Sequence, residues 1–247
     1  MSIPFDLQTY VTCAAGVGAA YVIFGITAFG AALFTVPLLS HFFPLQFVLP
    51  MVVLLDVAAA FALGTRFSRE ADKSELKLMV PASFIGAVLG VTLLVSLPRT
   101  ASIAALGAFL IAYGVYALHQ GGTVSPIGRV WAPVAGLTGG ALGTLFGVGA
   151  PPYAIYLSRR KTDLIAYRAT LSNMVLFSVS IRALVFLASG LMLADRVVGF
   201  VVLVPFALAG LWAGNHLQRR ISRTATLRLV SALLLLIGAS LLYRVFL

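Results

Sequence analysis

The sequence predicts an all-α polytopic membrane protein built from two related halves. Of its 247 residues, 61% are hydrophobic and 10% are charged, and the mean hydropathy is +1.05, whereas soluble domains carry about 25% charged residues. Apolar segments near the ~20 residues that cross a bilayer as a helix recur along the whole chain. Two of these segments are interrupted by clusters of Gly, Ala and Pro. This composition excludes a soluble globular domain and an intrinsically disordered chain.

The apolar segments follow the same order in both halves. In residues 1–120, an interrupted helix at 10–43 precedes spans at 47–64, 78–95 and 103–118. In residues 121–247, an interrupted helix at 130–157 precedes spans at 166–191, 197–217 and 227–242. Because Gly and Pro clusters break helices, we expect one broken, re-entrant helix and three transmembrane helices in each half.

The two halves are also related residue by residue. Residues 81–118 align with residues 205–242 without a gap and share eleven identities in thirty-eight positions. The shared residues include two glycines, Gly86 and Gly90 in the first half, and an Arg-Thr-Ala triplet that begins at Arg99. Apolar composition alone does not match Gly, Pro and Arg at fixed spacing, so the alignment indicates an internal repeat.

The charges predict how the repeats are oriented. The formal net charge is +10, which in a soluble protein would suggest nucleic acid. Here the basic residues lie between apolar segments, so we expect no nucleic-acid partner. If both broken helices are hairpins that enter and leave on one side, eleven of the fourteen inter-segment Lys and Arg share a face. The positive-inside rule then makes that face cytoplasmic, and three crossings per half make the two repeats inverted.

The two helix breaks are the candidate binding site, because the start of a half-helix presents free amides and a positive dipole end to an anion. The first break runs from Gly25 to Ala32 and the second from Gly143 to Pro152. The alternative is that these small residues only let helices pack closely. The candidate substrate-binding residues of the two breaks are Thr27, Gly30, Ala31, Ala32, Thr144, Gly147, Gly149, Ala150, Pro151 and Tyr153.

Two ionisable residues lie deep in predicted spans. Asp56 and Arg182 each stand eight residues before a segment-ending glycine, so the inverted halves place them at comparable depth. Ionisable residues within a membrane are expensive and are functional candidates by default. We expect Arg182 to balance a substrate charge and Asp56 to serve coupling or gating. The alternative is a structural ion pair between the two side chains.

A second polar cluster opens the sixth segment of the predicted order. Arg168, Thr170 and Asn173 have spacings that place them roughly on one helical face, and we expect Arg168 and Asn173 to flank the second break. For Arg168, the alternative is a charge that serves only to orient the protein in the membrane.

In combination, the motifs resemble the sulfite exporter TauE/SafE family of membrane permeases. The resemblance covers nearly the whole chain and rests on Phe29–Ala32, Val36–Leu39, Leu145–Pro152 and Tyr167–Ser172. It implies export of small sulfur oxyanions or organosulfonates by a multi-pass protein of the bacterial inner membrane. The first break departs from the family's usual Gly-Gly-Gly, with Ala31 and Ala32 in place of two glycines, so the second half is expected to dominate binding.

The predicted function is therefore a secondary transporter or facilitated exporter of small anions. It would work by alternating access at a midplane site between the two breaks, with the substrate anion and the lipid bilayer as partners. The alternatives are a proton-coupled importer or a channel for a small organic anion, and a non-transporting membrane assembly protein. No enzyme is expected, since the sequence has no His-Glu-x-x-His or Gly-x-Ser-x-Gly motif,. No cofactor or metal is predicted, and a homo-oligomer is left open.

Overall fold

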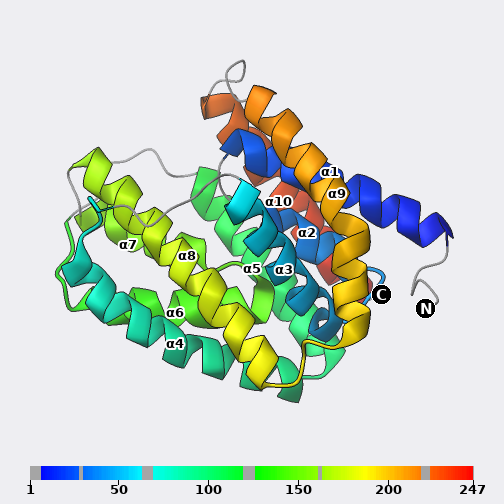
Figure 1. Ribbon diagram of the computed structural model, residues 1–247, viewed down its shortest axis with the longest axis horizontal. Coiled ribbons are helices and arrows are strands. Elements are labelled where there is room, and N and C mark those ends of the chain that lie inside the picture. Colours follow the sequence, from blue (N-terminus) through cyan, green and yellow to red (C-terminus); the bar gives the residue numbers. More distant parts are fainter. Residues whose placement is uncertain are drawn as a thin grey trace. The chain divides into compact units, whose positions relative to one another are not determined.

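The computed structural model describes residues 7–27, 30–62, 69–118, 126–160, 163–217 and 223–246. These residues form ten helices and no strand (Figure 1). The helices are α1 (Leu7–Thr27), α2 (Ala31–Ser40), α3 (Leu45–Ala62), α4 (Lys73–Ser96), α5 (Arg99–Leu118), α6 (Trp131–Phe146), α7 (Ala150–Arg160), α8 (Leu164–Ala188), α9 (Ala194–Leu217) and α10 (Arg223–Phe246). The predicted all-α fold class is confirmed.

Both interrupted segments are broken where the sequence predicts. The first divides into α1 and α2, and the second into α6 and α7. The breaks are narrower than their Gly-rich clusters, because Gly25 still lies within α1 and Gly143 within α6. The six uninterrupted segments are α3, α4, α5, α8, α9 and α10, and their ends differ from the predicted ones by a few residues.

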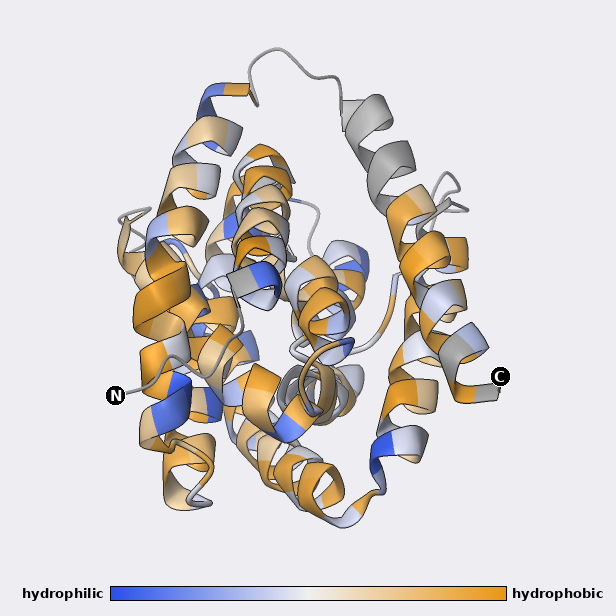
Figure 2. Cartoon of the chain, turned by 90° about the vertical axis from the view of Figure 1, so that its right-hand side faces the viewer, coloured by the Kyte–Doolittle hydropathy of each residue, from blue (hydrophilic) through white to orange (hydrophobic). Residues whose placement is uncertain are grey.

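Several helices are long and apolar enough to cross a membrane. Within the described residues these are α1, α3, α4, α5, α8 and α9, and α10 contributes an apolar stretch from Ser231 to Tyr243. Large apolar side chains also face outward, as on α4, where Phe84, Ile85, Val88 and Leu89 are exposed. Figure 2 shows hydrophobic residues along most of the visible helices. Outward-facing apolar side chains suit contact with lipid, so the chain is a multi-pass membrane protein.

The described helices form two compact units. The first comprises residues 1–55, 97–122 and 193–247, and the second comprises residues 56–96 and 123–192. Each unit therefore contains helices from both predicted halves. In the first unit, α1 packs on α9 and α5 packs on α10. In the second unit, α6 packs on α4, and α7 and α8 also pack on α6. The division at residue 120 and the inverted orientation of the halves stay predictions.

Glycines bring the paired helices into backbone contact. In the second unit, a Cβ at Gly86 or Gly90 of α4 would overlap the carbonyl groups of Leu137 or Ala141 of α6. In the first unit, Gly210 and Gly214 of α9, which the sequence alignment matches to Gly86 and Gly90, meet the backbone of α1 in the same way. Small residues stabilise helix pairs in lipid because close approach increases van der Waals contact.

We predict that adding a Cβ at one of these close contacts destabilises the protein. Gly140 of α6 faces the backbone of Ser83 of α4 so closely that a Cβ cannot be accommodated without movement. Gly140→Ala should lower the free energy of unfolding by about 1–3 kcal/mol. The measurement is thermal unfolding of the purified protein in detergent.

Gly18→Ala is the matched control. Gly18 is also a helical glycine, but a Cβ there would lie 3.7 Å from its nearest neighbouring atom, an ordinary contact. Because alanine is the better helix former by about 1 kcal/mol, this variant should be neutral or slightly stabilised. Equal loss of stability in both variants would contradict the close-packing explanation.

Candidate anion-binding site

The second helix break begins at a glycine in the left-handed conformation. Gly147 ends α6 with φ 78°, a backbone conformation that side chains with a Cβ rarely adopt. Its amide donates to the carbonyl of Gly143 at 2.9 Å, and the amide of Val148 donates to the carbonyl of Leu142 at 3.2 Å. These two bonds close the end of α6, and α7 begins three residues later, at Ala150.

The start of α7 offers few backbone donors. Pro151 and Pro152 occupy the second and third positions of the helix, and proline has no amide hydrogen. The amides of Gly149 and Ala150 are the backbone donors left at this helix end. An anion held here therefore needs side-chain donors as well.

Gly149 is packed tightly against the elements around it. A Cβ at this position would lie 2.7 Å from the carbonyl oxygen of Gly139 and 3.3 Å from Oγ of Ser178. The absence of a side chain thus brings the start of α7 into contact with both α6 and α8. This is the close helix packing that was given as the alternative role of the small residues in the breaks,.

Three hydroxyl groups meet one turn into α7. Tyr153 is fully buried, and its Oη lies 2.8 Å from Oγ of Ser83 on α4 and 3.2 Å from Oγ of Ser178 on α8. Both serines are also buried. Ser178, which lies beside Gly149, links this hydroxyl cluster to the start of α7.

Arg182 brings a buried cation to the same break. Its Nη1 donates to the carbonyl of Gly143 at 3.0 Å, and its Nη2 lies 3.0 Å from Oδ2 of Asp56. The residue is 5% exposed, and its buried Nε has no hydrogen-bond partner. A buried N–H without a partner is costly, so this donor is suited to a ligand. The ion pair weighed as an alternative for Asp56 and Arg182 is present.

The remaining candidates of the two breaks belong to different units. Gly30, in the left-handed region at φ 83°, caps α2 in the first unit, where Ala31 and Ala32 are buried. Thr27 is the last residue of α1, and its side chain lies outside the described residues. Thr144 is fully buried in the second unit and donates its hydroxyl to the carbonyl of Gly140 at 3.0 Å.

The cluster at the start of α8 does not share one environment. Arg168 is exposed, whereas Thr170 and Asn173 are buried. The expectation of a common helical face is therefore wrong for Arg168, because a spacing of two residues places Arg168 and Thr170 about 200° apart around a helix. The hydroxyl of Thr170 accepts the amide of Asp72 at 2.9 Å, which ties α8 to the start of α4.

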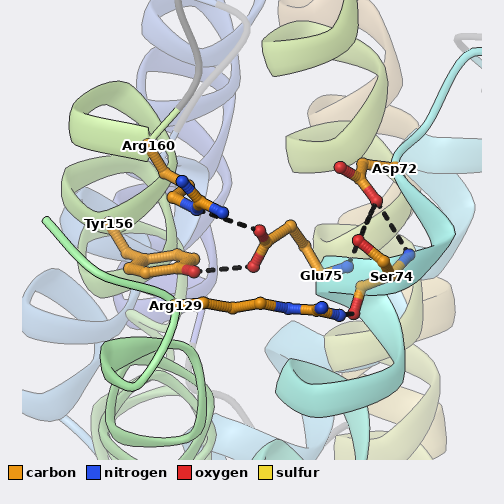
Figure 3. A network of polar contacts seen from close by, with 6 residues as sticks. All are labelled: Asp72, Ser74, Glu75, Arg129, Tyr156 and Arg160. Carbon is orange, nitrogen blue, oxygen red and sulfur yellow. Dashed lines mark hydrogen bonds and ion pairs between the residues drawn. The ribbon is translucent and has the colours of Figure 1, made fainter. Parts of the chain in front are cut away.

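Glu75 is a buried glutamate that the sequence pattern does not reveal. The apolar segments place residues 66–77 between two spans, but α4 begins at Lys73 and buries Glu75, which is 1% exposed. Figure 3 shows the Glu75 carboxylate between Tyr156 and Arg160 of α7. Tyr156 and Arg160 lie 81 and 85 residues after Glu75 in the chain, so this contact gives no local sequence signal. Among the described residues, no group of three or more His, Cys, Asp or Glu is placed to hold a metal.

Apolar membrane-spanning helices and a buried arginine beside a helix break are the features of a membrane transporter. The family described as Sulfite exporter TauE/SafE matches residues 12–241, and the chain belongs to this family. It is 29% identical over 196 residues to "Probable inner membrane transporter protein TsaS" of Comamonas testosteroni, across 77% of this chain and 81% of the relative. No solved structure matches the chain.

The buried pair makes a prediction about stability. Asp56→Leu leaves the Arg182 charge buried without its counter-charge, which should lower the free energy of unfolding by about 3–5 kcal/mol. The double variant Asp56→Leu with Arg182→Met removes both charges and should recover most of that loss. The measurement is a double-mutant cycle on unfolding in detergent. Independent, additive effects of the two positions would show that the pair contributes no coupling.

Proposed function

We propose that this transporter exports small oxyanions of the sulfite or organosulfonate type across the bacterial inner membrane. The family description supports an oxyanion substrate, and the relative's name supports the inner membrane. The observation that carries the site is Arg182, a buried cation with one unpaired N–H beside the second break. A homo-oligomer remains compatible with this proposal.

In this proposal the anion binds at the start of α7. Its oxygens accept hydrogen bonds from Nε of Arg182, from the amides of Gly149 and Ala150, and from the neighbouring hydroxyl groups. Arg182 and Gly149 both lie close to Gly143, since a Cβ there would be 3.3 Å from Cδ of Arg182 and 3.5 Å from the amide nitrogen of Gly149. Arg168 and Asn173, nearer the start of α8, are proposed as secondary contacts on the way to this site.

Charge balance favours a monoanion at this site. Asp56 lies 3.0 Å from Arg182 and is 15% exposed at its side chain, so the pair is formally neutral before substrate arrives. Donors aimed at the anion, together with the positive end of α7, then provide the attraction. A dianion would bring one more uncompensated charge into a low-dielectric region, which disfavours its binding.

The membrane potential gives the direction of transport. An interior-negative potential favours exit of an anion by about 2.3 kcal/mol per charge per 100 mV, so a facilitated exporter needs no nucleotide. Alternating access is the proposed mechanism, and it rests on the internal repeat, whose equivalent glycines line equivalent helix pairs in each unit. Gly30, Ala31 and Ala32 of the first break are proposed to serve the same pathway.

We predict that purified protein in liposomes carries sulfite or a short sulfonate in a saturable, potential-dependent manner. Flux of labelled sulfite, sulfate and methanesulfonate is measured with the potential clamped at two values. The monoanions methanesulfonate and hydrogen sulfite should be preferred over the dianion sulfate, because the resting site is formally neutral. Absence of flux for all three anions would contradict the proposed substrate class.

Tyr153 provides the sharpest test of the site. Tyr153→Phe keeps the ring and removes the hydroxyl that meets Ser83 and Ser178, so KM for the transported anion should rise about threefold to tenfold, as expected for a lost hydrogen bond. The control is Ser158→Ala, which removes an exposed hydroxyl from the same helix. Equal KM values in the two variants would place the anion elsewhere.

Proton-coupled import is the second candidate, and Asp56 is the observation that favours it. Its side chain is a carboxylate within a candidate membrane span and is only partly exposed. If protons couple through this group, Asp56→Asn should abolish the dependence of flux on a pH gradient while leaving potential-driven flux. Unchanged pH dependence in protein that remains folded would remove Asp56 from any coupling mechanism.

A further inference from the structure

Helix α7, whose start is the proposed anion site, is attached to α4 by two separate polar contacts. One joins Tyr153 to Ser83 at the anion site, and the other joins Tyr156 and Arg160 to Glu75. Tyr153 and Tyr156 are one turn apart on α7, and Glu75 and Ser83 are about two turns apart on α4. One short helix thus connects Glu75 to the proposed anion site.

The Glu75 contact is strong but has one exposed partner. Oε2 of Glu75 accepts from Oη of Tyr156 at 2.6 Å, and Oε1 accepts from Nε of Arg160 at 3.2 Å. The glutamate side chain is 1% exposed, whereas that of Arg160 is 38% exposed (Figure 3). Arg160 can thus exchange its carboxylate partner for water or for an anion from solution, while Glu75 stays in place.

Other contacts hold the start of α4 rigidly. Oδ1 of Asp72 accepts from the amide of Ser74 at 2.8 Å and from its hydroxyl at 2.6 Å, which caps the helix,. Nη2 of Arg129, just before α6, donates to the carbonyl of Ser74 at 2.6 Å, and Thr170 binds the amide of Asp72. Glu75 is therefore anchored, and α7 is the partner that can be released.

The sequence repeat has no second copy of this contact. When the register that matches Pro81 to Pro205 is continued six residues toward the N-terminus, Gly199 stands opposite Glu75. Glycine has no side chain to form an ion pair, and Gly199 is buried in α9. A specialised role, present at only one of the two related helices, fits this difference better than a general need for helix packing.

We propose that Glu75 is a positioning residue for the anion site and that its separation from Arg160 opens the site toward the basic face, the predicted cytoplasmic side on which eleven inter-segment Lys and Arg gather. The inference rests on the proposed function of the second break. While the contact is closed, Tyr156 and Arg160 hold α7 against α4, and Gly149 and Tyr153 keep their positions. When it opens, α7 tilts away from α4 at its charged end and uncovers the buried hydroxyl groups.

The test measures access to the site directly. Ser178, beside Gly149 and Tyr153, is replaced by cysteine in a Cys13→Ala background, since Cys13 is the only natural cysteine. Alkylation of Cys at 178 by a charged thiol reagent is then timed in membrane vesicles of both orientations. Glu75→Gln, which removes the charge and keeps the shape, should speed labelling from the basic face about tenfold, equivalent to about 1.4 kcal/mol in the opening equilibrium.

Two further variants guard against a purely structural effect. Arg160→Gln changes the more exposed partner and should reproduce the faster labelling from the basic face, even if Glu75→Gln does not fold. Arg159→Gln removes the same charge from the neighbouring position and should leave the labelling rate unchanged. Combining Glu75→Gln with Arg160→Gln should add nothing to either single variant. Labelling within about twofold of the parent in both single variants, from both faces, would overturn the proposal.

A protection experiment separates this inference from the proposed function. Sulfite and methanesulfonate are added during labelling, and each should slow alkylation at position 178 if the anion site is correctly placed. Faster labelling in Glu75→Gln without protection by any anion would retain the positioning role of Glu75 and contradict the proposed site. Protection with unchanged labelling would retain the site and contradict the role of Glu75.

Discussion

Burial of the Arg182 guanidinium is the constraint around which the second helix break is organised. A cation taken out of water needs a counter-charge and hydrogen-bond acceptors, and here Asp56 and the carbonyl of Gly143 supply them. The long side chain also needs space, which Gly143 leaves open because it lacks a Cβ. The glycines of α6 thus fit both the close approach of the helices and the burial of the arginine.

Helix α7 is joined to its neighbours in the second unit by several polar contacts. This helix is too short to cross a bilayer, and two of its buried residues are tyrosines whose hydroxyls bind partners on α4 and α8. These polar contacts can exchange partners, whereas the backbone contact between α4 and α6 offers no such exchange. The unit therefore combines a pair of long helices in backbone contact with one short helix that is joined to α4 by hydrogen bonds and an ion pair.

The sequence could predict the helices and both breaks from residue type and position, and it offered the Asp56–Arg182 ion pair as the alternative to separate functional roles. Glycine clusters indicate helix breaks regardless of which elements pack against them. An ionisable residue within an apolar span needs a charged or polar partner. Glu75 was missed because a glutamate among Lys and Arg resembles an exposed inter-segment charge. The hydroxyl cluster was only partly foreseen, since Ser83, Tyr153 and Ser178 are brought together by tertiary packing alone. Arg168 was misplaced because spacing alone does not show which face of a helix is buried.

The glycine-lined contacts between α4 and α6, and between α1 and α9, have a thermodynamic consequence. Helices already surrounded by lipid release little water when they pair, so their association rests on dispersion forces and close fit. Exposure of apolar surface to water is what gives soluble proteins their large heat capacity of unfolding and their loss of hydrophobic stability in the cold. Separation of these helix pairs within a bilayer should therefore carry a small heat-capacity change, and cooling should leave the pairs intact.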